Sequence, residues 1–243
     1  MNSGAATGSG SDVVLLHGWG TNASVWRSVV ERLEARFRVH SPTLPFAAGR
    51  DTHDAATLEE IADSLAAGAP ARCAVCGWSL GGVVALAWAL RAPHQVSRLA
   101  LIATSPCFVQ RADWPHALEV EAMQALARGL MHDPAAVLRR YVALQAYGDV
   151  RTSRAARHLR QTLSGTVRQA EAMRLHSGLS FLQRTDLRSS LPHITQPTLV
   201  IHGDRDAVTP LAAGEHLARA IPGARLVVVA GAAHAPFASE PQH

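Results

Sequence analysis

The chain has 243 residues, of which 48% are hydrophobic, and this length and composition are typical of one globular domain. Its formal net charge of +4 favours acidic partners in general without identifying one. Residues 1–11 lack the basic and apolar segments of a secretory signal, and no apolar run approaches the roughly 18 residues of a membrane span. Three cysteines are too few and too unevenly spaced for a disulfide framework. We therefore expect a cytoplasmic monomer with no membrane partner.

Short β-branched or aliphatic runs predict six strands, at residues 13–16, 37–40, 74–76, 98–103, 198–202 and 225–229. Leucine, valine and isoleucine recur three or four residues apart between these runs, which predicts helices at residues 26–36, 58–67, 82–91 and 211–220. Fully apolar strands that alternate with helices are typical of a parallel sheet covered on both faces. The predicted fold class is therefore α/β, with a mostly parallel, doubly wound sheet.

The strand pattern is interrupted between about residues 108 and 191, where arginine- and alanine-rich helical segments replace it. No period of 20 to 50 residues repeats, which excludes repeat architectures. We expect a single domain over residues 1–243, with residues 108–191 forming a helical cap inserted over the sheet.

The motif G-x-S-x-G at residues 77–81 lies directly between an apolar strand and a helix. In a nucleophile elbow these glycines are required because the turn is so tight that side chains flanking the serine would collide. The alternative is a glycine-rich connection in which Ser79 caps the next helix. The strand before the motif and the helix after it favour Ser79 as a nucleophile.

A serine nucleophile needs a histidine to take its proton and an acid to orient that histidine. His234 follows the last strand through a loop of small residues, whereas His202 ends a strand beside a glycine and is expected to be structural. For the acid, Asp206 and Asp204 both follow the fifth predicted strand. The G-x-x-D spacing favours Asp206, and Asp204 is interpreted as a turn residue, although the two roles could be exchanged.

Two backbone amides are expected to stabilise a developing oxyanion. One is that of Leu80, directly after the nucleophile and at the start of a helix. The other is that of Trp19, in the loop that follows the first predicted strand.

Other chemistries find little support in the sequence. No metal-binding helix motif, P-loop or G-x-G-x-x-G is present, so neither a metal nor a cofactor is expected. Nucleic-acid binding would need aromatic interleaving or a known module, and the sequence has neither.

The chain resembles the pimeloyl-[acyl-carrier protein] methyl ester esterases of biotin synthesis, a family within the α/β hydrolases. The resemblance covers nearly all of the chain from Val13 onward, and its motifs lie at residues 15–20, 77–82, 105–108, 140–145 and 232–237. One departure is at residues 44–50, where the family usually has L-P-G-x-G-x-S.

The resemblance implies the α/β-hydrolase fold and hydrolysis of a methyl ester on a pimeloyl chain carried by acyl carrier protein, with release of methanol. It places the catalytic roles on Ser79, Asp206 and His234. It also implies a substrate-binding set consisting of Trp19, Ser79, Leu80, Tyr141, Val142, Ala143, Leu144, Gln145 and His234.

A group of arginines in the predicted cap agrees with an acidic carrier protein as partner, because a basic patch beside the pocket would speed and orient docking. The arginines expected to dock the carrier are Arg139, Arg140, Arg154, Arg157 and Arg160. The alternative for this patch is an ordinary solvated helix face. Two alternatives remain for the chain: a broad-specificity short-chain carboxylesterase independent of a carrier protein, and a hydrolase-fold protein that only binds a ligand.

Overall fold

The computed structural model describes residues 6–44, 57–163 and 167–239. Residues 44–50 form the loop whose sequence differs from the usual motif of the family, and only Leu44 of these residues lies within the described ranges. Six strands form one sheet in the order β2-β1-β3-β4-β5-β6, and every neighbouring pair is parallel. The strands are β1 (Ser11–Leu16), β2 (Phe37–His40), β3 (Cys73–Trp78), β4 (Val96–Ile102), β5 (Thr198–Gly203) and β6 (Arg225–Val229). The predicted α/β fold class with a parallel sheet is confirmed.

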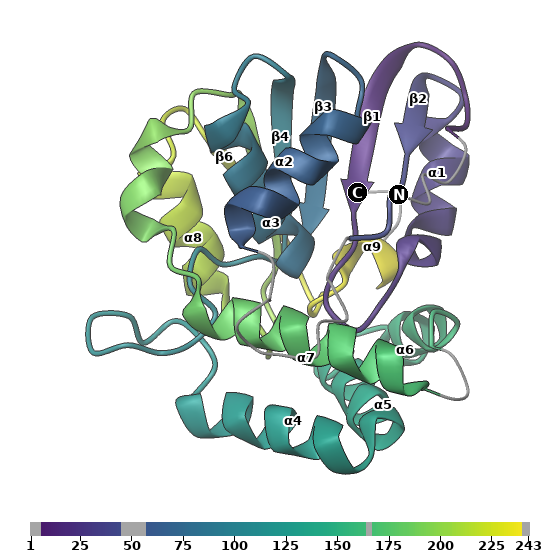
Figure 1. The fold of residues 1–243 in the computed structure, drawn as a ribbon, viewed down its shortest axis with the longest axis vertical. Coiled ribbons are helices and arrows are strands. Elements are labelled where there is room, and N and C mark those ends of the chain that lie inside the picture. Colours follow the sequence, from purple (N-terminus) through teal and green to yellow (C-terminus); the bar gives the residue numbers. More distant parts are fainter. Residues whose placement is uncertain (1–5, 45–56, 164–166, 240–243) are drawn as a thin grey trace.

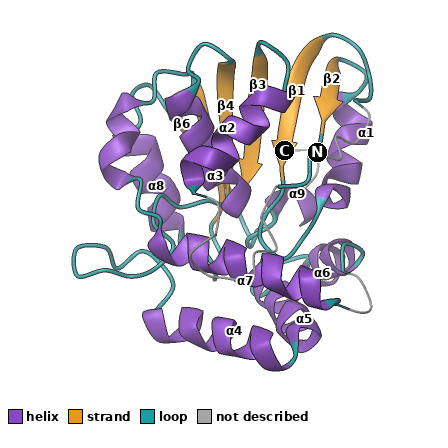
Figure 2. Cartoon of the chain, viewed as in Figure 1, coloured by secondary structure: helices purple, strands orange, loops and turns teal. Residues whose placement is uncertain are grey.

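Helices cover both faces of this sheet, as Figures 1 and 2 show. Along β1 the side chains alternate, so that Val14 and Leu16 pack with helices of one face and Leu15 packs with those of the other. The first face carries α2 (Leu58–Gly68), α3 (Leu80–Arg91) and α8 (Leu211–Ala220). The second carries the 3₁₀ helix Ala23–Trp26, α1 (Arg27–Leu33) and the short α9 (Pro236–Ser239).

The helix boundaries follow local signals where these are strong. Helix α2 begins at a capping box, in which the Thr57 side chain accepts from the Glu60 amide and the Glu60 carboxylate accepts from the Thr57 amide. Helix α3 begins at Leu80, two residues before the predicted start, although glycines occupy its first turn. Burial of almost the whole helix outweighs their low helix propensity.

Four α-helices lie between β4 and β5 in the described residues, at the edge of the sheet toward which the strand arrows point in Figure 2, and the 3₁₀ helix Arg188–His193 follows them. They are α4 (Val120–His132), α5 (Pro134–Gln145), α6 (Thr152–Arg160) and α7 (Gln169–Arg184). All four fall within the range predicted for the cap, and we refer to residues 120–184 as the cap. No helix in the described ranges is long and apolar enough to cross a membrane.

Candidate active site

Ser79 lies on the turn between β3 and α3, in a backbone conformation that L-residues rarely adopt, with φ 54° and ψ −120°. Close contacts explain the glycines around it. A Cβ atom on Gly77 would lie 2.3 Å from the Gly81 carbonyl oxygen, and one on Gly81 would lie 2.2 Å from the Leu16 carbonyl oxygen. The turn is held by the Thr104 hydroxyl, which donates to the Ser79 carbonyl oxygen at 2.7 Å. The G-x-S-x-G segment therefore presents its serine as a nucleophile elbow does.

Three side chains from distant parts of the chain form one hydrogen-bonded series. Ser79 Oγ lies 2.9 Å from His234 Nε2, and His234 Nδ1 lies 2.8 Å from Asp206 Oδ2. Ser79 and His234 are fully buried, and Asp206 is 7% exposed. The arrangement has the order and the atoms of a Ser-His-Asp triad, in which the imidazole relays a proton while the carboxylate holds its tautomer.

The carboxylate of Asp206 is extensively hydrogen-bonded. Its Oδ1 accepts from the amides of Val208 and Thr209 at 2.8 and 2.9 Å, and its Oδ2 accepts from the Thr209 hydroxyl at 2.7 Å. Burial alone would raise the pKa of this carboxyl, but the neighbouring rings of His234 and His202 lower the pKa below its ordinary value. Asp206 is therefore held ionised.

Asp204, the alternative candidate for the acid of the triad, makes a different contact. Its Oδ1 accepts from the Gly231 amide at 2.7 Å, so it joins the loop after β5 to the loop after β6. His202 Nε2 lies 3.5 Å from Asp206 Oδ2, but its Nε2–H donates to the Thr209 carbonyl oxygen at the shorter distance of 2.7 Å. The geometry therefore pairs His234 with Asp206 and leaves Asp204 as the turn residue.

The loop after β1 carries Trp19, one of the two expected oxyanion donors. Its indole Nε1–H donates to the Leu175 carbonyl oxygen of α7 at 2.8 Å, and its ring meets Tyr141 edge-on with centroids 4.7 Å apart. The other expected donor, Leu80, is the first residue of α3, where helix amides have no partner within the helix.

His17 holds the loop after β1 through both nitrogens of its ring. Its Nδ1–H donates to the Gly18 carbonyl oxygen at 2.9 Å, and its Nε2 accepts from the Leu44 amide at 3.1 Å. Burial lowers the pKa of this imidazole from 6.5 to about 4, so the ring is neutral at pH 7 and keeps its acceptor.

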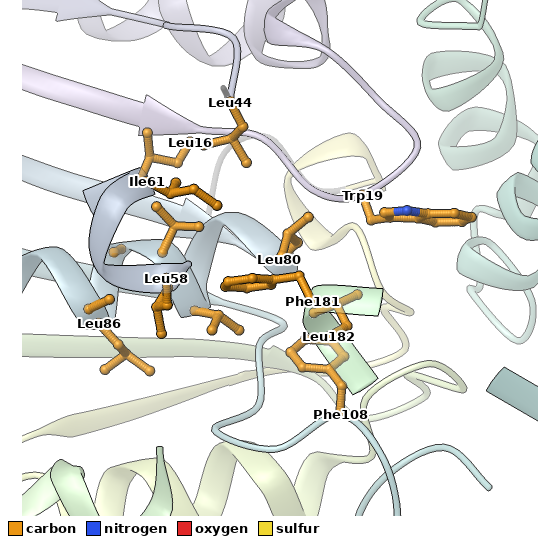
Figure 3. Close-up of a cluster of buried hydrophobic side chains, with 14 of the residues drawn as sticks. Leu16, Trp19, Leu44, Leu58, Ile61, Leu80, Leu86, Phe108, Phe181 and Leu182 are labelled. Carbon is orange, nitrogen blue, oxygen red and sulfur yellow. The ribbon is translucent and has the colours of Figure 1, made fainter. Parts of the chain in front are cut away.

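A cleft of about 540 Å³ opens beside Trp19 and Leu80. Its walls come from both the sheet domain and the cap, and they combine five leucines with polar and charged side chains that include Arg168, Glu171 and Arg174. Figure 3 shows that Leu80 also lies beside Phe181 and Leu182 of α7. The leucines of this lining suit an aliphatic chain, because each methylene removed from water contributes about 0.8 kcal/mol.

The predicted substrate contacts on α5 divide between its two faces. Tyr141, Val142 and Gln145 are buried, Leu144 is half-buried and Ala143 is exposed. Burial raises the pKa of the Tyr141 phenol, and the hydrogen-bonding neighbours of that phenol include the side chains of Gln145 and Ser79. The buried face of α5 thus places polar groups beside the nucleophile.

All five arginines expected to dock a carrier protein are exposed. Arg139 and Arg140 lie in the middle of α5, and Arg154, Arg157 and Arg160 follow one another at intervals of three along α6. None of the five forms an ion pair with another described residue. The side chains of α5 and α6 thus leave several positive charges open to a partner.

Sequence reasoning missed two residues that hold the series together. The indole of Trp78 donates to the His234 carbonyl oxygen at 2.7 Å, and the hydroxyl of Thr209 contacts both Asp206 and His234 Nδ1, at 2.7 and 3.3 Å. A signal for Thr209 existed in the turn that begins at Asp206, since an aspartate commonly accepts from amides two and three residues ahead. No local pattern identifies the contact of Trp78. The described residues contain no group of three or more side chains that could hold a metal ion.

Comparisons with known proteins agree with this geometry. The sequence profile of the alpha/beta hydrolase fold family matches residues 13–241. The chain is 45% identical to the pimeloyl-[acyl-carrier protein] methyl ester esterase of Aromatoleum aromaticum, over 95% of this chain and 94% of that protein. It is 41% identical to the protein of the same name from Nitrosomonas europaea, over 97% of this chain and 93% of that protein.

Among solved structures, an esterase from Exiguobacterium antarcticum superposes with a TM-score of 0.82 at 24% identity, covering 98% of this chain and 90% of its own. At that identity the likeness bears on the fold alone. The chain belongs to the alpha/beta hydrolase fold family, within which it groups with the pimeloyl-[acyl-carrier protein] methyl ester esterases.

Proposed function

We propose that this chain is a serine carboxylesterase that removes the methyl ester from pimeloyl-[acyl-carrier protein] methyl ester, releasing methanol in biotin synthesis. The observation that carries the proposal is the series Ser79–His234–Asp206, with distances of 2.9 and 2.8 Å, in a chain 45% identical to a relative of that name. The reaction requires no cofactor.

In the proposed reaction Ser79 Oγ attacks the ester carbonyl carbon while its proton passes to His234 Nε2. The amides of Trp19 and Leu80 stabilise the oxyanion that forms on the carbonyl oxygen. His234 then gives the proton to the methoxy oxygen as its bond to the carbonyl carbon breaks, so that methanol leaves and the acyl group stays on Ser79. Water, deprotonated by His234, hydrolyses this acyl-enzyme, and Asp206 stabilises the imidazolium in both halves.

The remaining predicted contacts hold the acyl chain in this proposal. Methylene groups pack against the leucines of the cleft beside Trp19 and Leu80, one of which, Leu138, belongs to the buried face of α5. Tyr141, Val142 and Gln145 belong to the same buried face of α5. Leu144 and the exposed Ala143 are assigned to the edge of the contact.

We further propose that the exposed arginines of α5 and α6 dock the carrier protein. Their charges are free of ion pairs within the described residues, and a positive patch attracts an acidic partner most strongly at low ionic strength. The enzyme is proposed to act as a cytoplasmic monomer, which agrees with three cysteines that are all free. Sedimentation at increasing protein concentration tests the monomer.

Replacement of the nucleophile tests the chemistry. The Ser79→Ala variant should lose methanol release from the carrier-bound ester by about a factor of 10⁶, because the covalent route disappears. The matched control is Ser153→Ala, which alters an exposed serine of α6. A Ser79→Ala enzyme that retains its rate would refute the mechanism.

Reversal of the arginine charges on α5 and α6 tests whether the substrate is bound to a carrier protein. The triple change of Arg140, Arg154 and Arg157 to glutamate should impair turnover of the carrier-bound ester and leave p-nitrophenyl acetate hydrolysis unchanged. The control reverses Arg36, Arg72 and Arg225, which are exposed next to the amino ends of β2, β3 and β6, away from the cap. Equal activity of the cap variant on both substrates would favour the broad-specificity esterase instead.

A further inference from the structure

The cap is hydrogen-bonded directly to the loop that carries His234. The His234 amide donates to the Gln145 carbonyl oxygen at the end of α5 at 3.1 Å, and the Val150 amide donates to the Gly231 carbonyl oxygen at 2.9 Å. We call these two segments, residues 145–150 and 231–234, the cap–histidine junction. These two hydrogen bonds join backbone to backbone, so they do not depend on which side chains stand at these positions.

Asp149 adds a side-chain hydrogen bond between the two segments of the junction. Its Oδ2 accepts from the Ala233 amide at 3.0 Å, and its Oδ1 accepts from the Arg151 amide at 2.7 Å. The residue is 4% exposed. A buried carboxylate that accepts from two amides is a strong and directional link, because charge-assisted hydrogen bonds are about twice as strong as neutral ones.

The place of this link along the chain matters, because Ala233 directly precedes His234. On its other side the histidine peptide is held by the Trp78 indole, which donates to the His234 carbonyl oxygen at 2.7 Å. The sheet domain holds the other end of the same peptide group, because the Arg205 amide donates to the Ala232 carbonyl oxygen at 3.0 Å, and its bond from Gly231 to Asp204 lies further back. Asp149 is thus the cap side chain that holds the amide end of the Ala232–Ala233 peptide, one peptide before the one that joins Ala233 to His234.

We propose that Asp149 is a positioning residue, which holds the His234 imidazole between Ser79 and Asp206 only while the cap is seated. The inference rests on the proposed function, since it assumes that His234 is the general base. Loss of the link frees the amide end of the Ala232–Ala233 peptide and lets the backbone that leads into His234 shift. A displacement of about 1 Å at a reacting group typically costs about 100-fold in rate.

The test compares Asp149→Ala with Asp133→Ala. Asp133 is an exposed cap aspartate that also accepts from a backbone amide, that of Ala136 at 2.9 Å, but it caps α5 and does not contact the histidine loop. Both changes should lower the melting temperature by about 2 to 4 °C. On p-nitrophenyl acetate, Asp149→Ala should lower kcat about 10- to 100-fold with KM within about twofold, and Asp133→Ala should change kcat less than about threefold.

The rate of Ser79 labelling by a fluorophosphonate should fall in parallel with kcat, and the labelled fraction at the end point normalises each rate to folded enzyme. Asp149→Asn covers the case in which the alanine variant fails to fold. Asparagine keeps the shape of aspartate, but one of its two oxygens is replaced by an NH2 group, which cannot accept a hydrogen bond from a backbone amide. The kcat of this variant should therefore also fall. Unchanged kcat in the folded Asp149 variants, or equal losses in Asp149→Ala and Asp133→Ala, would overturn the inference. A wild-type enzyme that neither hydrolyses esters nor labels at Ser79 would instead overturn the proposed function.

Discussion

The neutral imidazole of His17 predicts a specific loss of stability in mild acid. In the folded chain its Nε2 accepts from the Leu44 amide, and protonation would remove that acceptor. Because burial lowers the pKa of His17 from 6.5 to about 4, the unfolded chain binds this proton more readily than the folded chain does. Stability is therefore complete above pH 6.5, and falls as the pH is lowered from 6.5 to 4.

The size of this effect follows from the two pKa values. The full difference corresponds to about 3 kcal/mol of unfolding free energy, of which about 2 kcal/mol is lost between pH 7 and pH 5. For a chain of this length, that loss lowers the melting temperature by about 4 to 8 °C.

Urea unfolding of the wild type and of His17→Gln at pH 7, 6 and 5 measures the effect. A glutamine side-chain oxygen can accept from the Leu44 amide but does not titrate, and the contributions of all other groups cancel in the comparison. The wild type should lose about 2 kcal/mol more than the variant between pH 7 and pH 5. Parallel curves for the two proteins would refute the reasoning.

Three further changes test the site. Asp206→Asn should lower kcat about 10⁴-fold while the circular dichroism spectrum stays unchanged, because the wrong imidazole tautomer is favoured. Gly81→Ala should abolish the yield of folded protein, since its Cβ would lie 2.2 Å from the Leu16 carbonyl oxygen; a normal yield would contradict so close an approach of the two backbones. Trp19→Phe removes the hydrogen bond to Leu175 and should raise KM several-fold, in line with about 1 kcal/mol for one hydrogen bond, as steady-state kinetics would measure.

The sheet and the three residues of the hydrogen-bonded series could be predicted because their signals are local. The strands are short apolar runs, and the glycines beside Ser79 report a backbone approach that only glycine allows. Asp206 and His234 each follow a strand of one parallel sheet, and the carboxyl ends of such strands meet at the same edge.

The contacts that fix these residues could not be predicted, because they join segments that are far apart in the sequence. Asp149 is 84 positions from Ala233, whose amide donates to it, and the Trp78 indole is 156 positions from the His234 carbonyl oxygen to which it donates. Nothing in the local sequence of either residue specifies such a partner. The same holds for α5, where the resemblance covers residues 141–145 as a block but the helical period turns Ala143 outward.

Neither Ser79 nor His234 exposes any surface to water. An ester, and later the hydrolytic water, reaches the hydroxyl only after neighbouring side chains or the cap have moved. Substrate therefore binds the fraction of molecules that are open at a given moment, and the measured affinity is weaker than that of the open form by this fraction. Substitutions that make opening more frequent would speed substrate entry without altering a single reacting group.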